Sequence, residues 1–287
     1  MTTPAARAVL RRGRALRRPP SPRRRAADRP PARPAPALDA GRRSSLRSAA
    51  MKTVILVAGA WHGGWCWKKM VGPLTAAGCR VYTPSLTGLG DRRHLLTREV
   101  SLQTHVDDLL ELLAFEDARD VVLLAHSYGA APATVVADRV PERIAHLILL
   151  DGTQPEDGQC VLDVLGEADG LPELFRGIAR EQGDGWRVSP AAFTADLLGV
   201  TDPADAEWLM ARLTDHPLPT FEDRVSLTGA AARIPRRTYV RTQFPPVWPD
   251  VLLERARSSD GWTGMTLPTG HDAMVTMPGE LVDLVLS

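Results

Sequence analysis

The chain has 287 residues, 44% of them hydrophobic, so it is long enough for one large core or two modest ones. Its formal net charge of +1 hides an asymmetry: residues 1–50 hold fourteen Arg and two Asp, a net of +12, whereas the other 21 basic and 32 acidic residues give −11. An acidic body argues against nucleic acid as a partner of the folded domain. The three scattered cysteines, Cys66, Cys79 and Cys160, are too few for a disulfide framework or a zinc site, and we expect buried thiols in a cytoplasmic protein.

Residues 1–50 are rich in Arg, Pro and Ala and have no apolar face that a core could bury. We expect a disordered tail or a non-native upstream extension that precedes a working start at Met51; a transit peptide and a nucleic-acid arm are the alternatives. The tail lacks the apolar stretch of roughly 7 to 15 residues that a secretory signal needs. No later segment has the roughly 18 consecutive apolar residues that span a bilayer, so we expect no membrane partner.

From Met51 onward, apolar runs typical of buried strands alternate with segments of helical spacing. The expected strands are 53–57, 80–83, 121–125, 144–150, 238–242 and 263–267, and the expected helices include 67–77, 104–115 and 130–139. This alternation predicts an α/β fold, a mostly parallel sheet with helices on both faces. The alternation breaks down after residue 151. We expect a small helical cap there, called the cap region (residues 152–233), whose apolar side chains would line a pocket.

The stretch AHSYGA, residues 125–130, lies between an expected strand and an expected helix. A serine in a tight strand-to-helix turn between small residues is typical of a nucleophile elbow, in which the backbone is strained and the hydroxyl exposed. The N-terminus of the following helix would favour negative charge near the serine. We therefore interpret Ser127 as a nucleophile rather than as an ordinary loop serine.

Five motifs occur in a fixed order along residues 51–287: AGAWHGGWCW, LTGLGDRRHLL, AHSYGA, ERIAHLILLDG and TGHDAMVTMP. Together they resemble the α/β-hydrolase family of small bacterial esterases, and they are similar to plant methylesterases and hydroxynitrile lyases. The resemblance implies an α/β-hydrolase fold, with Ser127 as nucleophile and His271 as general base. It also implies an oxyanion hole made by the backbone N–H groups of Ala60 and Tyr128. We expect no cofactor and no metal, because no dinucleotide, Walker or HExxH motif is present.

The groups that support the nucleophile depart from the family pattern. Ala58 stands where relatives carry a histidine before Gly59, which predicts a softened oxyanion hole. Relatives commonly place the acid of the triad after the strand that is here 238–242, but no carboxylate occupies that spot. Asp151, which follows strand 144–150, is the favoured candidate, because some dehalogenases of this fold keep their acid there. Asp250 and the absence of any functional acid remain alternatives.

The six other histidines are expected in loops or helices and in structural roles: His62, His94, His105, His126, His146 and His216. The favoured function is hydrolysis of carboxylic esters with small to medium apolar groups, through an acyl-enzyme on Ser127. A lyase is the second hypothesis; in hydroxynitrile lyases a lysine follows the catalytic histidine, and Asp272 in that place counts against cyanohydrin cleavage. A non-hydrolytic homologue, either a tailoring enzyme or a ligand-binding protein, is the third.

Overall fold

The computed structural model describes residues 51–166, 170–244 and 251–287. The predictions for residues 1–50 and for Asp250 fall outside the described residues. Six strands form one sheet in the order β2-β1-β3-β4-β7-β8, and each neighbouring pair is parallel. They are β1 (Thr53–Val57), β2 (Arg80–Tyr82), β3 (Val121–His126), β4 (Ile144–Leu150), β7 (Arg236–Thr242) and β8 (Trp262–Leu267). The predicted α/β sheet is confirmed, with strand ends displaced by at most two residues.

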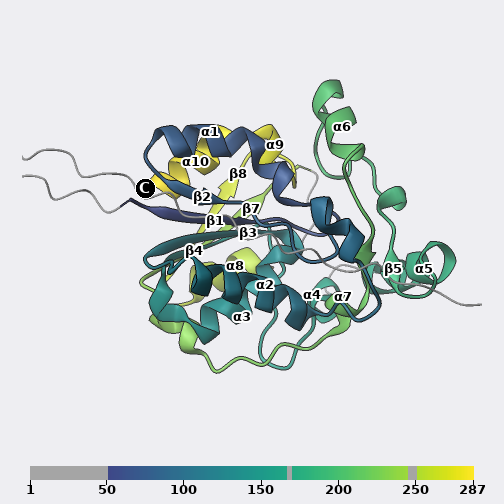
Figure 1. Cartoon of the computed structure of the whole chain (residues 1–287), viewed down its shortest axis with the longest axis horizontal. Coiled ribbons are helices and arrows are strands. Elements are labelled where there is room, and N and C mark those ends of the chain that lie inside the picture. The colour runs from purple at the N-terminus through teal and green to yellow at the C-terminus, as the bar shows by residue number, and fades with distance from the viewer. Residues whose placement is uncertain (1–50, 167–169, 245–250) are drawn as a thin grey trace, which may run out of the picture. The chain divides into compact units, whose positions relative to one another are not determined.

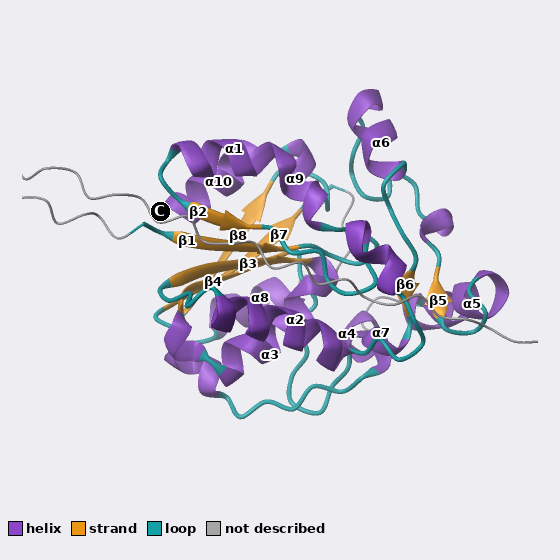
Figure 2. Cartoon of the chain, in the orientation of Figure 1, coloured by secondary structure: helices purple, strands orange, loops and turns teal. Residues whose placement is uncertain are grey.

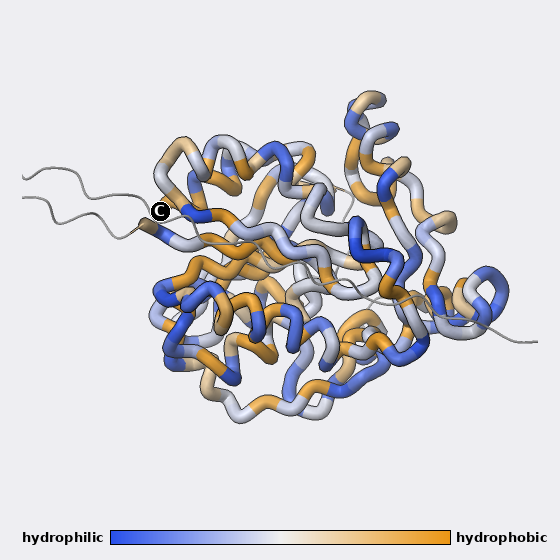
Figure 3. Tube along the Cα trace, viewed as in Figure 1, coloured by the Kyte–Doolittle hydropathy of each residue, from blue (hydrophilic) through white to orange (hydrophobic). Residues whose placement is uncertain are grey.

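Helices cover both faces of the sheet (Figure 1). One face carries α1 (Lys68–Ala76), α9 (Ala273–Thr276) and α10 (Pro278–Leu286); the other carries α2 (Leu102–Phe115), α3 (Ala130–Arg139) and α8 (Val251–Ser258). Along β1, Val54 and Leu56 belong to the core under the first set of helices, and Ile55 and Val57 belong to the core under the second. A parallel strand that is buried on both faces must be apolar throughout, which explains the continuous runs in the sequence. Figure 3 shows these apolar strands between helices whose outer surfaces are more polar.

The cap region lies between β4 and β7. It contains α4 (Val161–Leu165), α5 (Leu171–Gln182), β5 (Arg187–Val188), a 3-10 turn (Pro190–Ala192), α6 (Pro203–Met210), β6 (His216–Pro217), α7 (Pro219–Glu222) and a 3-10 turn (Ala230–Arg233). The strands β5 and β6 pair antiparallel in a small sheet of their own (Figure 2). Only helices were expected in the cap region. The two strands were not predicted, because a strand of two residues is too short to show an alternation of apolar and polar residues.

Some helix bounds differ from the expected ones. The helix expected at 67–77 is a 3-10 turn (Gly64–Trp67) followed by α1, and α2 begins at Leu102 because the side chain of Ser101 accepts a hydrogen bond from the backbone N–H of Thr104. Other 3-10 turns are Gly90–Leu95, Ser127–Gly129 and Pro141–Arg143. The three cysteines are buried and free, as expected. None of the described helices combines the length and the apolar character needed to cross a bilayer.

Candidate active site

Ser127 follows the last residue of β3 and precedes α3, in a backbone conformation that few side chains tolerate. Its φ is 51°, in the left-handed region, where a residue other than glycine costs about 1–2 kcal/mol. The carbonyl of Ser127 accepts a hydrogen bond from the backbone N–H of Thr153 (3.1 Å), which holds the turn from the cap side. The turn also needs small neighbours, since a Cβ on Gly59 would lie 2.8 Å from the Cβ of Ser127 and one on Gly129 would lie 2.4 Å from the carbonyl oxygen of Ala58. The serine is therefore raised out of the backbone beside the loop that follows β1.

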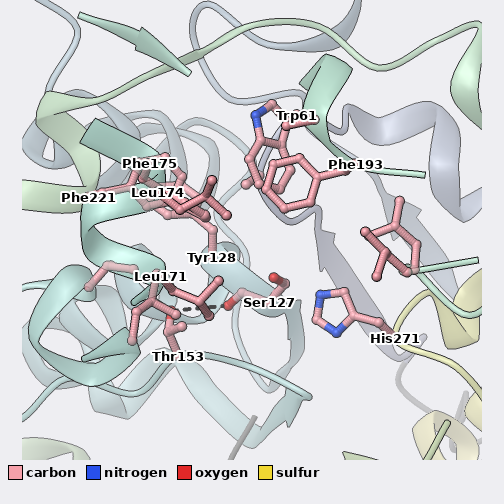
Figure 4. Close-up of a pocket in the computed structure, with 16 residues that line it drawn as sticks. Trp61, Ser127, Tyr128, Thr153, Leu171, Leu174, Phe175, Phe193, Phe221 and His271 are labelled. Atoms are coloured by element: carbon pink, nitrogen blue, oxygen red, sulfur yellow. Dashed lines mark hydrogen bonds between the residues drawn. The ribbon is translucent and has the colours of Figure 1, made fainter. Parts of the chain in front are cut away.

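His271 lies in the loop after β8, and Figure 4 shows its imidazole beside the side chain of Ser127. On its far side, Nδ1–H donates to Oδ2 of Asp151 at 2.6 Å. A carboxylate on Nδ1 fixes the tautomer in which Nε2 carries no proton and can act as a base, and it stabilises the imidazolium that follows. Ser127, His271 and Asp151 are thus arranged as a nucleophile, a base and an acid. In the chain, 24 residues separate Ser127 from Asp151, and 120 separate Asp151 from His271.

Asp151 is fully buried and accepts four hydrogen bonds. Oδ1 accepts from Nη1 of Arg241 (2.9 Å) and from the backbone N–H of Thr242 (3.2 Å). Oδ2 accepts from the hydroxyl of Thr242 (2.6 Å) and from His271. Burial alone would raise the pKa of Asp151, but the hydrogen bonds from His271 and Thr242 and the charge of Arg241 outweigh it and lower the pKa. The carboxylate is therefore ionised, and Arg241 and Thr242, which bind it, lie at the end of β7.

A cavity of about 360 Å³ opens above Ser127 and His271. Ala60 and Tyr128, the expected oxyanion residues, also line it, whereas Asp151 does not and lies behind His271. The remaining lining is almost wholly apolar and comes mainly from the cap region: Trp61, Thr153, Val161, Leu165, Leu171, Leu174, Phe175, Ala192, Phe193, Leu197, Leu198 and Phe221. Among these described residues there is no Asp, Glu, Lys or Arg, so the cavity suits a neutral, apolar molecule.

Aromatic side chains form one wall of the cavity (Figure 4). The ring of Trp61 lies 4.4 Å from that of Phe193 and 5.7 Å from that of Phe175, measured between ring centroids. Phe221 packs between Phe175 and Tyr128, with centroid distances of 5.1 Å to each. The indole N–H of Trp61 donates to the carbonyl of Val188 in the cap region (2.9 Å), so the wall has a fixed orientation.

Two buried histidines support the aromatic wall from behind. Structural roles were expected for both, but their contact with this wall was not predicted. His105 Nε2–H donates to the carbonyl of Thr87 (2.9 Å), which leaves Nδ1 to accept from the hydroxyl of Tyr128 (2.7 Å). His216 Nδ1 accepts from the backbone N–H of Trp61 (3.3 Å). Burial lowers the pKa of His105 to about 4 and that of His216 well below its usual value, so both are neutral. Polar residues between apolar positions were the only sequence signal for them.

The expectation that the other histidines lie in loops or helices is wrong for three of them. His126 ends β3, His146 lies in β4 and His216 lies in β6. His126 Nε2–H donates to the carbonyl of His271 (3.0 Å) and so holds the loop that carries this residue. Burial is the main reason that the pKa of His126 falls to about 3, and the nearby His271 lowers it further.

Asp272, which follows His271, does not line the cavity. It is fully buried, and its Oδ2 lies 3.1 Å from Nε2 of His62, on the side of the loop away from the substrate cavity. Among the described residues, His126, His271 and Asp272 are close enough together to hold a metal ion. Two of the ring nitrogens already bind protein groups: Nε2 of His126 bonds to the carbonyl of His271, and Nδ1 of His271 bonds to Asp151.

The cap region meets the His271 loop at two glycines. A Cβ on Gly199, whose φ is +73°, would lie 2.3 Å from the Cα of Gly270, and a Cβ on Gly270 would lie 2.4 Å from the Cα of Gly199. Next to them, the backbone N–H of Asp272 donates to the carbonyl of Leu198 (3.1 Å). The backbones therefore touch, and the cap region fixes the position of the loop that carries His271.

Comparison with known proteins shows which family the sequence and the fold resemble. The model of the alpha/beta hydrolase family matches residues 54–284. A carbendazim-hydrolysing esterase from Nocardioides is 35% identical over 240 residues, which are 81% of this chain and 98% of that protein. An Arabidopsis thaliana protein described as a chloroplastic methylesterase is 30% identical over 74% of this chain and 64% of its own length. Among solved structures, an extracellular alpha/beta-hydrolase from Paenibacillus has a TM-score of 0.68 at 20% identity, over 82% of this chain and 98% of that one.

Proposed function

Because the chain belongs to the alpha/beta hydrolase family, we propose that it is a serine esterase with Ser127 as nucleophile, His271 as general base and Asp151 as acid. That it is a carboxylic ester hydrolase follows from its 35% identity, over most of its length, to an esterase. The serine mechanism rests on one observation above all: Ser127, in a strained turn with φ of 51°, faces an imidazole whose Nδ1–H is bonded to a buried carboxylate. An imidazole with its tautomer fixed in this way is a suitable base for a serine hydroxyl.

The proposed reaction has two halves. His271 Nε2 takes the proton of the Ser127 hydroxyl as Oγ attacks the ester carbonyl carbon, and the carbonyl oxygen becomes an oxyanion near the backbone N–H groups of Ala60 and Tyr128. The tetrahedral intermediate then expels the alcohol, which takes its proton from His271. In the second half, His271 removes a proton from water, the hydroxide attacks the acyl group, and the acid leaves as Ser127 regains its proton.

The cavity supports a proposal for the substrate class. Its volume of about 360 Å³ and its aromatic and aliphatic lining suit a neutral ester of a small to medium apolar acid or alcohol. A substrate with a fixed charge near the scissile bond would meet no described side chain of opposite charge in the lining, so burying its charge would be costly. The Nocardioides relative is named for carbendazim, which makes this compound a useful member of an assay panel.

The test is turnover of a panel of p-nitrophenyl esters, methyl esters and carbendazim by the protein from Met51 onward. Ser127→Ala removes the nucleophile and should lower kcat by at least about 10³-fold for every substrate that the wild type hydrolyses. The matched control is Ser258→Ala in α8, where the exposed hydroxyl binds only the backbone of its own helix. Unchanged turnover by Ser127→Ala would reject the assignment of the nucleophile.

A further inference from the structure

In the loop after β1, hydrogen bonds hold most of the backbone N–H and carbonyl groups. The carbonyl of Gly59 accepts from the backbone N–H of His62 (3.3 Å), and the N–H of Trp61 donates to Nδ1 of His216. The carbonyl of Trp61 accepts from the N–H of Thr214 (3.0 Å). Within the described residues, the N–H of Ala60 has no hydrogen-bond acceptor, and Ala60 lines the cavity beside Ser127. The constraints on its neighbours thus leave this one N–H available to a substrate.

The loop needs such constraints because it is strained. Trp61 has a φ of 64°, a left-handed conformation that is unusual for a bulky residue and persists only where the surroundings impose it. Ala58, at the start of the loop, contributes no polar side chain to hold it. Some other group has to fix the peptide between Ala60 and Trp61.

That group is the side chain of His62. Its Nδ1–H donates to the carbonyl oxygen of Ala60 at 2.7 Å, and its Nε2 lies 3.1 Å from Oδ2 of Asp272. The imidazole and the carboxylate are 2% and 0% exposed. The carbonyl oxygen and the carboxylate are both acceptors, so a protonated His62 satisfies both at once. Burial would lower the pKa of His62, but the charge of Asp272 and its hydrogen bond outweigh burial and raise it.

We propose that His62 is a positioning residue: through its bond to the Ala60 carbonyl, and anchored by Asp272, it holds the N–H of Ala60 towards the reacting carbonyl. This inference rests on the proposed esterase function and adds to it a second buried His–Asp pair. His271 and Asp272 are neighbours in the chain, so the pair also joins the loop that binds the oxyanion to the loop that carries the base. Neither His62 nor Asp272 lines the cavity, and neither would touch the substrate.

Two variants separate the contact with Ala60 from the ion pair. In His62→Gln, the amide nitrogen takes the place of Nε2, so the bond to Asp272 is kept and the donor to Ala60 is lost. In the double variant His62→Asn with Asp272→Asn, the amide of residue 62 takes the place of Nδ1, so the donor to Ala60 is kept and no unpaired carboxylate is buried. An exposed ion pair supplies the control: Asp205→Asn breaks the contact with Lys69 (2.7 Å) at the surface.

The measurement is kcat and KM for one p-nitrophenyl ester, with thermal unfolding of each protein. Loss of one oxyanion donor costs about 10²- to 10³-fold in kcat, and a displaced donor should cost less. We expect His62→Gln to lower kcat by roughly 10- to 100-fold with KM within about twofold, and the double variant to recover kcat to within about fivefold of the wild type.

The inference is overturned if His62→Gln keeps the kcat of the wild type, or if both variants lose kcat equally, since a merely structural pair would treat them alike. It is also overturned if His62→Gln fails to fold while the double variant folds. The same assay with Ser127→Ala keeps the two hypotheses apart. An inactive Ser127→Ala beside a fully active His62→Gln rejects the positioning role alone, whereas an active Ser127→Ala rejects the esterase mechanism itself.

Discussion

The sheet region, the described residues of 51–151 and 234–287, and the cap region contribute to the cavity in different ways. Ser127, His271 and Asp151 all follow strands of the sheet, and parallel strands that end at one edge bring such residues together. The cap region supplies most of the apolar lining and, among the cavity residues, no ionisable side chain. In the proposed esterase, the sheet region supplies the reacting groups and the cap region supplies most of the walls that contact the substrate.

The two regions differ in how substitutions should act. A change at a strand end should lower kcat by a similar factor for all substrates, because it acts on the reacting groups. A change in the cap region should alter the ratio of kcat/KM between substrates, because it acts on the walls. A substitution at the contact between Gly199 and Gly270 should be an exception. Although Gly199 lies in the cap region, it touches the loop that carries His271, so a change there should lower kcat for all substrates.

The largest effect is expected from Asp151→Asn. The amide would no longer stabilise the imidazolium of His271 and would favour the wrong tautomer, so kcat should fall by about 10²- to 10⁴-fold for every ester in a panel. Steady-state kinetics with acetate and butyrate esters check this. Asp138→Asn is the matched control: Asp138 is also buried, but it accepts bonds from the backbone N–H groups of Thr228 and Ala231, away from the cavity. A small loss in Asp151→Asn would remove Asp151 from the catalytic set.

The next effect tests the contact between the regions. Gly199→Ala places a Cβ 2.3 Å from the Cα of Gly270, so the loop with His271 has to move. A displacement near 1 Å costs on the order of 10²-fold in rate, and kcat should fall by that order for all substrates. Gly185→Ala is the control, because Gly185 has a φ of +80° in the same region with nothing within 4 Å of its Cβ. It should lose only stability, about 1 kcal/mol, and equal kcat losses in the two variants would refute the role of the contact.

A smaller effect should appear in the aromatic wall. Phe193→Ala removes the ring that packs on Trp61 at 4.4 Å and widens the cavity. The ratio of kcat/KM for a hexanoate ester to that for an acetate ester should rise by about tenfold, since lost packing weakens binding of the small acyl group. Phe115→Ala, at a ring that is 86% exposed on α2, should leave the ratio as it is. If kcat/KM falls by the same factor for the hexanoate and the acetate ester in Phe193→Ala, the wall does not select the acyl group.

The smallest effect concerns the histidines that join the regions. His105 and His216 have lowered pKa values because they are buried, as His126 and His146 do in the sheet region, so all four oppose protonation in the folded state. Their contribution to stability is complete above the unfolded pKa near 6.5 and is lost as the pH falls towards about 4 for His105, at up to about 1.4 kcal/mol per pH unit for each residue. The raised pKa of His62 acts in the opposite direction, so the net loss is smaller.

Urea unfolding at pH 7.5 and 5.5 measures this loss. With four such histidines and His62 acting against them, the free energy of unfolding should be lower at pH 5.5 by about 2–5 kcal/mol. His105→Gln, whose amide oxygen can still accept a bond, should make the dependence on pH shallower. An equal or greater stability at pH 5.5 would mean that the buried histidines are not held neutral.

The sequence allowed the sheet and two of the three proposed catalytic residues to be predicted, because these features are local. The strand, the small residues and the helix around Ser127 lie in one short segment, and His271 follows a strand that its apolar pattern reveals. Asp151 was the favoured acid, but Asp250 and the absence of an acid remained alternatives, since its contact with His271 spans 120 residues and no local pattern reports it. The groups at the end of β7, Arg241 and Thr242, bind Asp151, and no local pattern in the sequence reports these contacts.

The support of the oxyanion loop was missed for the same reason. Ala58 indicated that this loop lacks a supporting side chain. The proposed support comes from contacts between residues far apart in the chain: 155 residues separate Trp61 from His216, and 210 separate His62 from Asp272. The β5–β6 pair of the cap region was missed as well, because strands of two residues are determined by tertiary contacts rather than by their own pattern. Long-range polar contacts, more than the core, are what the sequence alone did not reveal.

The most direct test of the central claim is the reaction of the folded protein with a fluorophosphonate, followed by intact mass and peptide mapping. For a serine esterase we expect one phosphonate per chain, bound to the peptide that contains Ser127. We expect no adduct on the wild type unfolded in urea and none on Ser127→Ala. A folded, unlabelled wild type, or an adduct on any other residue, would contradict this expectation.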